Sequence, residues 1–168
     1  MKRLPLALLL ILISLTDSHS QIIYNNQSID DVINATYDIL SGEAGERDWE
    51  SFKSLFHESA KMGATILGQD GKRTFYGFTV DQYILNNDAF LKKSDFYEEE
   101  IGRRVMRFGG VAMVYSAFQY KFSKDGKIEA RGINCIQLVK EKGCWWITSL
   151  LWEDESINNK IPESLMHK

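Results

Sequence analysis

The side chains best suited to acid–base chemistry in this sequence are His57, Tyr37 and Tyr83. An imidazole titrates near neutral pH and can act as a general base, and a phenol can donate a hydrogen bond to a ligand oxygen. Each also has a simpler structural interpretation. His57 falls at the expected end of a short helix, where the helix dipole favours a histidine, and tyrosines on apolar helix stripes more often belong to the core. The sequence predicts His57 and Tyr37 as candidate catalytic residues and Tyr83 as a candidate ligand-binding residue.

Arg103 and Arg131 are the candidates for binding a ligand carboxylate, because a guanidinium group can donate two hydrogen bonds to it at once. Arg131 has an alternative role. Strand pairing is expected to place it beside Trp152 and Tyr120, where a cation–π stack would be purely structural.

Other patterns in the chain carry less chemistry. The sequence contains no His-Glu-x-x-His, Cys-x-x-Cys, Gly-x-Ser-x-Gly or phosphate-binding-loop pattern, so it predicts no metal site and no cofactor. The run Glu98-Glu99-Glu100 is expected to alternate faces on a strand and to form a solvated edge.

Apolar residues recur at helical spacing in the first half of the chain. They predict three helices, over about residues 29–41, 49–57 and 80–92. Two short strands, over residues 61–67 and 74–78, are expected between the second helix and the third.

The second half of the chain predicts a four-stranded meander, over about residues 96–108, 111–122, 127–140 and 144–153. Helices followed by a long antiparallel sheet are typical of an α+β domain. The expected fold is therefore α+β, with three N-terminal helices packed on a mostly antiparallel sheet.

Tight turns fix the register of such a meander and so predict which side chains share a face. The expected turns are Gly109-Gly110, Asp125-Gly126 and Glu141-Lys142. They place a polar row across one face, formed by Arg103, Ser116, Cys135 and Thr148. Trp146 and Trp152 fall on the same face.

A buried polar row needs hydrogen-bond partners, since an unpaired buried polar group costs about 1–3 kcal/mol. A ligand could supply those partners, in which case the row lines a pocket. Alternatively, Arg103 and Ser116 could satisfy each other or bind a helix end. On the first alternative, the candidate ligand-binding residues are Tyr83, Arg103, Ser116, Arg131, Cys135, Trp146, Thr148 and Trp152.

The same register places Cys135 opposite Thr148 and Cys144 opposite Val139. The two thiols would then be about 13–16 Å apart along adjacent strands, beyond the reach of a disulfide. We expect two free thiols, with Cys135 in the polar row.

The opposite face of the predicted sheet is also apolar, and it includes Met106, Met113, Tyr115, Trp145 and Leu151. Three helices can cover only one face of such a sheet. The second face is therefore expected to form a homodimer interface.

Residues 1–20 have the pattern of a cleaved signal peptide: Lys2 and Arg3, then an apolar run of about a dozen residues, then Ser18-His19-Ser20. The run is too short to span a bilayer, which needs about 20 residues. We expect a secreted or periplasmic protein with one domain over residues 21–168 and no membrane anchor after cleavage. The net charge of −3 and the lack of a basic run argue against nucleic-acid binding.

Five segments, in this order, resemble the NTF2-like superfamily, also called SnoaL-like or cystatin-like: GERDWESFKSLFHESA, FTVDQYI, RRVMRFGGVAMVYSAF, ARGINCIQL and WWITSLLWEDE. The resemblance covers about residues 28–155 and is nearest to bacterial proteins of the nuclear transport factor 2 family. It implies a curved sheet that forms a cone-shaped pocket. The superfamily includes isomerases, dehydratases, cyclases, epoxide hydrolases, binding proteins and dimerisation modules, so the fold does not fix the activity.

The ketosteroid isomerases of this superfamily use a tyrosine, an aspartate base and a protonated aspartic acid. By this resemblance the tyrosine matches Tyr37, but the base falls near Gly63 or Ala64 and the acid near Cys135. The sequence therefore excludes that activity.

The function expected from the sequence is an exported domain that binds a small, partly apolar molecule in its cone. One alternative is a cofactor-free lyase, isomerase or hydrolase that uses His57, Tyr37 or Arg103. The other is a dimerisation or interaction module.

Overall fold

The computed structural model describes residues 26–166. The expected signal peptide, residues 1–20, lies outside this range. Within it, no helix combines the length and the apolar character that crossing a membrane requires.

The three predicted helices are present: α1 (Ile29–Leu40), α2 (Trp49–Lys53) and α3 (Val80–Leu91). The side chains of Ser28 and Thr79 cap α1 and α3, each through a reciprocal capping box. The prediction for the second helix was wrong at its end. It stops at Lys53 because β1 begins at Phe56, so His57 lies on a strand and not at a helix terminus.

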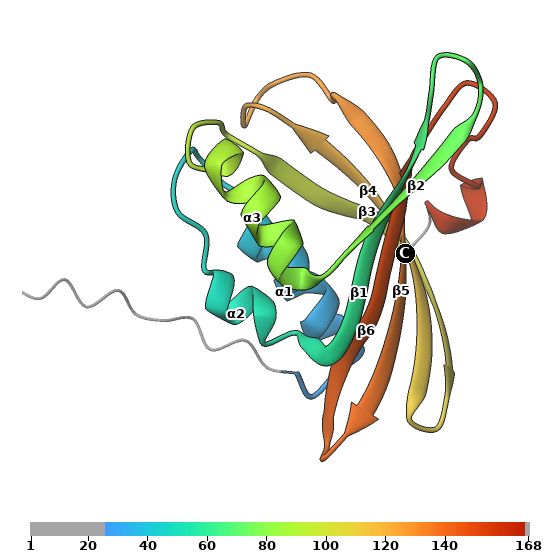
Figure 1. Cartoon of the computed structure of the whole chain (residues 1–168). Coiled ribbons are helices and arrows are strands. Elements are labelled where there is room, and N and C mark those ends of the chain that lie inside the picture. Colours follow the sequence, from blue (N-terminus) through green and yellow to red (C-terminus); the bar gives the residue numbers. More distant parts are fainter. Residues whose placement is uncertain (1–25, 167–168) are drawn as a thin grey trace, which may run out of the picture.

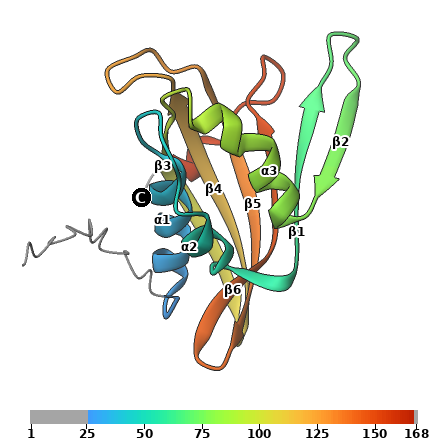
Figure 2. The same ribbon diagram turned by 60° about the vertical axis from the view of Figure 1, so that its left-hand side comes forward.

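Six strands form one curved sheet in the order β2-β1-β6-β5-β4-β3 (Figures 1 and 2). Their bounds are β1 Phe56–Leu67, β2 Arg73–Phe78, β3 Tyr97–Phe108, β4 Val111–Lys121, β5 Ala130–Glu141 and β6 Cys144–Asp154. Only β1 and β6 pair in parallel, and all other neighbours are antiparallel. The predicted α+β architecture is confirmed.

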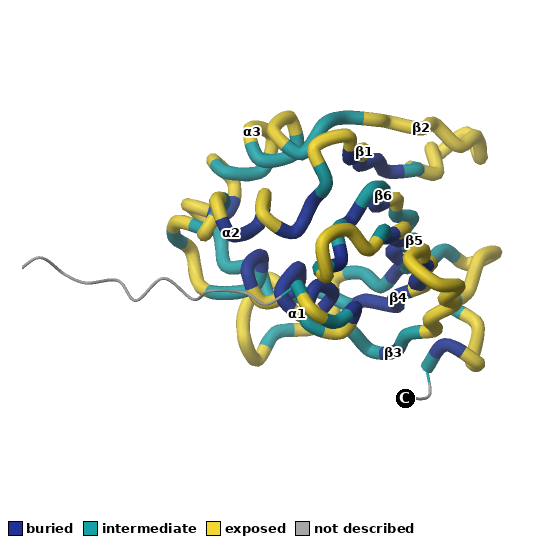
Figure 3. Tube along the Cα trace, turned by 90° about the horizontal axis from the view of Figure 1, so that it is seen from below, coloured by how far each residue is buried: buried dark blue, intermediate teal, exposed yellow. Residues whose placement is uncertain are grey.

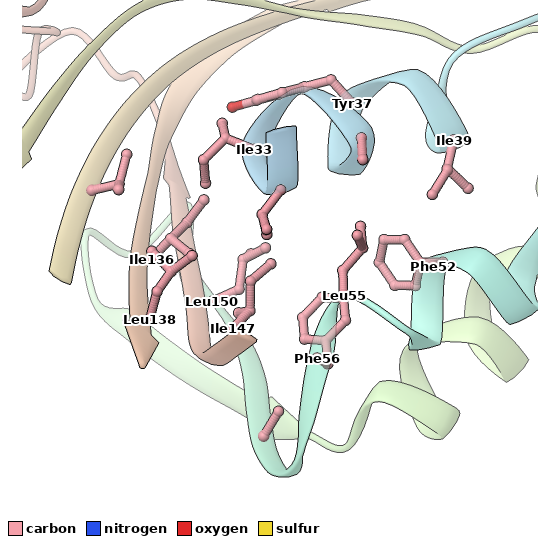
Figure 4. Close-up of a cluster of buried hydrophobic side chains, with 14 of the residues drawn as sticks. Ile33, Tyr37, Ile39, Phe52, Leu55, Phe56, Ile136, Leu138, Ile147 and Leu150 are labelled. Atoms are coloured by element: carbon pink, nitrogen blue, oxygen red, sulfur yellow. The ribbon is translucent and has the colours of Figure 1, made fainter. Parts of the chain in front are cut away.

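The helices lie together on the concave face of the sheet, and the core fills the space between them (Figures 3 and 4). The side chains of Val32, Phe52, Leu55, Ile136 and Ile147 are fully excluded from water. By contrast, β2 and its turn are exposed (Figure 3).

The Gly109-Gly110 turn fixes β3 against β4 as predicted, and Arg103 pairs with Ser116. A bulge lies further up β3, because the pairing shifts between Glu100 and Gly102. A bulge reverses the alternation of side chains. Glu98 and Glu100 therefore share the concave face with Arg103, and the prediction of a solvated edge was wrong for these two residues.

The register predicted between β4 and β5 was wrong by one residue. Residues 122–129 form a longer connection in place of a two-residue turn, with a hydrogen bond from the Gly126 amide to the Ser123 carbonyl. Ser116 therefore pairs with Asn134, and Tyr115 with Cys135. A one-residue shift reverses every side chain of a strand, so Asn134 faces the helices and Cys135 faces away.

The last hairpin also turns one residue later than predicted. Lys142 and Gly143 both adopt positive φ, 51° and 89°, as a two-residue hairpin turn requires. The pairing shifts again between Gln137 and Leu138, which leaves Thr148 out of the ladder.

This bulge in β6 explains why the faces of two tryptophans were predicted wrongly. Trp145 is buried in the core at 2 % exposure, whereas Trp146 and Thr148 point away from it. Cys135 lies opposite Leu151, not Thr148. Both cysteines are nevertheless free, as expected.

The C-terminal segment folds back across the convex face of the sheet, opposite the helices (Figure 1). It includes a short 3-10 helix, η1 (Glu163–Leu165), which packs against β3 and β4. The Leu165 side chain is buried. The chain itself therefore covers part of the face that the sequence assigned to a second subunit.

Gly102 marks the closest approach of this segment to the sheet. A Cβ atom at Gly102 would lie 1.8 Å from the Leu165 carbonyl oxygen, whereas one at Gly110 would make only ordinary contacts, the nearest at 3.6 Å. We expect Gly102→Ala to lower the free energy of unfolding by about 1–3 kcal/mol through overpacking. Gly110→Ala should change it by less than about 0.5 kcal/mol. Urea unfolding of both variants measures the difference, and equal stabilities would contradict this packing.

Candidate functional site

A cavity of ≈ 280 Å³ lies between the helices and the concave face of the sheet. Aromatic rings make up much of its wall. They come from Tyr37, Phe52, Tyr83, Phe90, Phe96, Phe118, Tyr120, Phe122 and Trp152. The cavity volume is just below the range typical of ligand sites, which is roughly 300–1,000 Å³.

The rings pack against one another as well as facing the cavity. Tyr83 stacks on Phe52 with ring centroids 5.6 Å apart and meets Trp152 edge to face at 6.1 Å. On the other side, Tyr120 lies 5.2 Å from Phe96 and 5.6 Å from Phe122. Such contacts hold the wall in a defined shape.

Two carboxylates, Glu98 and Asp154, also line the cavity. The bulge in β3 turns Glu98 inward, and its backbone is held from both sides because the Ser41 hydroxyl accepts from its amide and donates to its carbonyl. Asp154 is the last residue of β6. Among residues 26–166, no side chain or amide donates a hydrogen bond to either carboxylate, and no cation pairs with either.

Burial raises the pKa of Glu98 to about 8, and the nearby charge of Asp154 adds to the shift. Burial also raises the pKa of Asp154, with a further contribution from Glu153. A carboxyl group that titrates near neutral pH can take up or release a proton there. Glu98 is therefore the group in this cavity best suited to proton transfer.

A chain of hydrogen bonds closes the inner wall. The Tyr37 hydroxyl lies 2.6 Å from the Ser116 hydroxyl, and the Ser116 hydroxyl donates to Glu100 at 2.5 Å. Because Ser116 has only one proton, Tyr37 must be the donor to Ser116. Asn134 in turn donates to the Tyr37 oxygen at 3.0 Å.

This chain limits what Tyr37 can do. Its proton is committed to Ser116, and burial raises its pKa, with a further contribution from the charge of Glu98. Figure 4 shows Tyr37 reaching from α1 toward the sheet. Tyr37 and Asn134 therefore present polar atoms to the cavity but carry no readily released proton.

Arg103 is satisfied within the protein. Its guanidinium group contacts Glu100 at 2.6 Å and donates hydrogen bonds to two residues of α1, Asp30 at 2.6 Å and Asn34 at 2.7 Å. The expected alternative in which Arg103 binds a helix end is the one observed. Arg131 makes an ion pair with Glu155 at 2.8 Å, and within residues 26–166 its guanidinium group stacks on neither Trp152 nor Tyr120.

The cavity brings together only part of the predicted set: Tyr37, Tyr83 and Trp152 line it, and Ser116 binds Tyr37 directly behind its wall. Cys135 and Thr148 face the convex side because of the two register differences. Burial raises the pKa of the Cys135 thiol, which disfavours the reactive thiolate.

His57 and Trp146 lie elsewhere, beside the β5–β6 turn. The Nδ1 atom of His57 is 2.8 Å from the Ser59 hydroxyl, and its Nε2 atom is 3.8 Å from Glu141. Because β1 begins before His57, the imidazole points along an outer groove and does not line the cavity with Tyr37.

Sequence reasoning missed three polar residues that line the cavity: Glu98, Asn134 and Asp154. The signal available for Asn134 was its position as a polar residue between apolar neighbours on a strand. That signal identifies a cavity residue only when the register of the strand is known. Among the described residues, no group of His, Cys, Asp and Glu side chains is arranged to hold a metal ion.

By sequence, the chain matches no established family and no curated protein. Its structure is similar to several solved bacterial proteins. One, from Nostoc punctiforme, is a protein of unknown function with a cystatin-like fold, with TM-score 0.59 and 13% identity over 77% of this chain and 90% of that one. Another cystatin-like protein, from Caulobacter vibrioides, gives TM-score 0.56 and 17% identity over 77% and 89%.

A third similar structure, from Xanthomonas campestris, is a proposed calcium/calmodulin-dependent protein kinase II association domain, with TM-score 0.56 and 12% identity over 77% and 86% of the two chains. At these identities the similarity establishes the fold.

The raised pKa of Glu98 predicts a pH dependence of stability. The unfolded chain releases this proton near pH 4.5, whereas the folded chain retains it to about pH 8. The free energy of unfolding should therefore fall as pH rises between these values, by on the order of 5 kcal/mol. Glu98→Gln should remove most of this slope, leaving the smaller contribution of Asp154, which has the same sign.

Glu99→Gln is the matched control, since Glu99 is the neighbouring residue on the same strand and bonds outward to Gln119. Its pH profile of urea unfolding should match that of the unmodified protein. A profile that is flat between about pH 5 and about pH 8 would contradict the burial of an unpaired Glu98.

Proposed function

The chain has the cystatin-like fold of the NTF2-like superfamily, and we propose that it binds a small, partly apolar molecule in the cavity between its helices and its sheet. The observation that carries this proposal is the cavity itself. Its wall is aromatic, and it contains carboxylates that no described residue binds. An unpaired polar group away from water is costly. This cost concerns Glu98, since Asp154 is exposed to solvent, and a ligand with a complementary group would remove it.

We propose further that the protein is secreted or periplasmic, so that this binding takes place outside the cytoplasm. The support is the pattern of residues 1–20. Mass determination of the protein purified from its host tests it, because export with cleavage predicts a mature chain that begins near residue 21.

Tryptophan fluorescence can test binding in the cavity, since Trp152 lines it and Trp146 does not. We expect a small amphiphile from a panel of amines, carboxylic acids and neutral alcohols to raise the melting temperature and to change the emission. The change should be lost in Trp152→Phe and retained in the control Trp146→Phe. A change retained in Trp152→Phe would place the ligand elsewhere.

The second candidate function is a cofactor-free isomerase, lyase or hydrolase. The observation that favours it is the pKa of Glu98, which lies near the pH at which a carboxyl group works best as a general base. Glu98 takes the role that the sequence assigned to His57, and Asn134 is placed to donate a hydrogen bond to a substrate oxygen. For a substrate found by screening, kcat/KM should rise with pH to a midpoint near 8, and Glu98→Gln should reduce it by about 100-fold or more.

The third candidate function, a homodimer through the convex face, is favoured by an exposed apolar patch beside the β3–β4 turn. Met106, Phe108, Val111 and Met113 are 63%, 87%, 54% and 36% exposed. Exposed patches of this kind mark interaction surfaces, and the association-domain name of the Xanthomonas campestris protein is consistent with such a role.

Sedimentation velocity tests the dimer. We expect Met113→Glu to shift the protein from dimer to monomer, because a charge buried at an interface without a partner is costly. Leu85→Glu is the matched control, since Leu85 is 78% exposed on α3, far from the convex face. A monomer in all variants and in the unmodified protein would refute the interface.

A further inference from the structure

The cavity wall has one sign of charge. Its ionisable groups, other than tyrosines, are the carboxylates of Glu98 and Asp154, and no lysine, arginine or histidine of the described chain is part of the wall. An anionic ligand would meet two acids and no positive group. A neutral ligand could fill the space but would supply no counter-charge when the two carboxyl groups ionise.

A neighbouring acid, Glu100, has partners within the protein. Glu100, two residues along the same strand, is also turned inward by the bulge, and its side chain is only 6% exposed. It is fully partnered, by Arg103 at 2.6 Å and by the Ser116 hydroxyl at 2.5 Å. One inward glutamate thus has an internal cation, while Glu98 faces the cavity without one.

Aromatic residues lie beside both unpaired carboxylates. Tyr120 pairs with Glu98 across β3 and β4, and Trp152 lies two residues before Asp154 on β6. The faces of such rings attract organic cations, most strongly where water is excluded. Carboxylates and aromatic rings together bind ammonium groups far better than they bind neutral or anionic groups.

We propose that the cavity selects a ligand that carries a positively charged amine or quaternary ammonium group, held between Glu98 and Asp154 with its apolar part against the aromatic wall. This inference rests on the proposed binding function and adds the chemical class of the ligand. The cation supplies the counter-charge that Glu98 lacks, as Arg103 does for Glu100.

Cation binding in this cavity should depend on pH through Glu98. The groups that face Glu98 are Asp154 from β6 and the tyrosines of α1, α3 and β4, namely Tyr37, Tyr83 and Tyr120. Burial raises the pKa of each tyrosine, so all three stay neutral where Glu98 titrates. A cation that binds ionised Glu98 therefore binds more tightly as pH rises, and near neutral pH its binding releases a proton.

Calorimetric titration with matched probes tests the proposal. Choline and dimethylbutanol have the same shape, but carbon replaces the ammonium nitrogen in the second. Benzyltrimethylammonium and neopentylbenzene form a larger pair. At about pH 9 we expect at least one cation to bind about tenfold or more tightly than its neutral partner. Its affinity should fall at about pH 6, because Glu98 is then protonated. A quaternary ammonium group does not titrate, so the change in affinity reports on the protein.

Two variants locate the effect. Glu98→Gln should abolish both the preference for the cation and the pH dependence, while circular dichroism and melting show that it folds. Glu99→Gln, on the outward side of the same strand, should keep both. If the neutral partner binds as tightly as the cation, or if Glu98→Gln keeps the preference, the assignment to cations is overturned while binding in the cavity stands.

If neither cation binds, the assignment to cations is also overturned. The proposed binding function falls only if the wider panel of amines, acids and alcohols likewise leaves the emission of Trp152 and the melting temperature unchanged. The two proposals therefore fail by different observations.

Discussion

The buried ion pair between Arg103 and Glu100 connects the parts of the protein that form the cavity. Arg103 ties β3 to the first turns of α1 through Asp30 and Asn34. Glu100 ties β3 to β4 through Ser116, and Ser116 leads on to Tyr37 of α1. Breaking such a pair by removing one partner is far more costly than the pair is stabilising. The pair therefore fixes α1 against β3 and β4 beside the part of the cavity wall that Tyr37 forms.

Two irregularities in the sheet decide what faces that cavity. Without the bulge between Glu100 and Gly102, side chains would alternate along β3 without interruption. Ile101 would then point inward next to Arg103, and Glu98 would face solvent. Without the bulge in β6, Trp145 and Trp152 could not both face inward. Bulges often lie beside functional sites because they redirect single side chains. Here they bring an acid and an aromatic ring into the same enclosed space.

This dependence on bulges explains what the sequence could and could not predict. Helical periodicity and capping residues were sufficient for α1 and α3, and Gly109-Gly110 was sufficient to pair Arg103 with Ser116. The connection over residues 122–129 looked like a two-residue turn, and that single error exchanged Asn134 for Cys135. A bulge leaves no local signature comparable to a glycine pair, so Glu98 could not be placed from its neighbours alone.

The comparison between Glu98 and Glu100 also bears on stability. Both are inward glutamates on one strand. Glu100 is paired with Arg103, whereas Glu98 has no such partner and its pKa is raised. An unpaired buried acid lowers stability at neutral and higher pH, and a fold optimised for stability alone would pair it or replace it. Residues that depart from local rules tend to lie at functional sites. The unpaired carboxyl group of Glu98 therefore supports the proposal that this cavity binds a ligand, and the aromatic rings beside it support a cationic one.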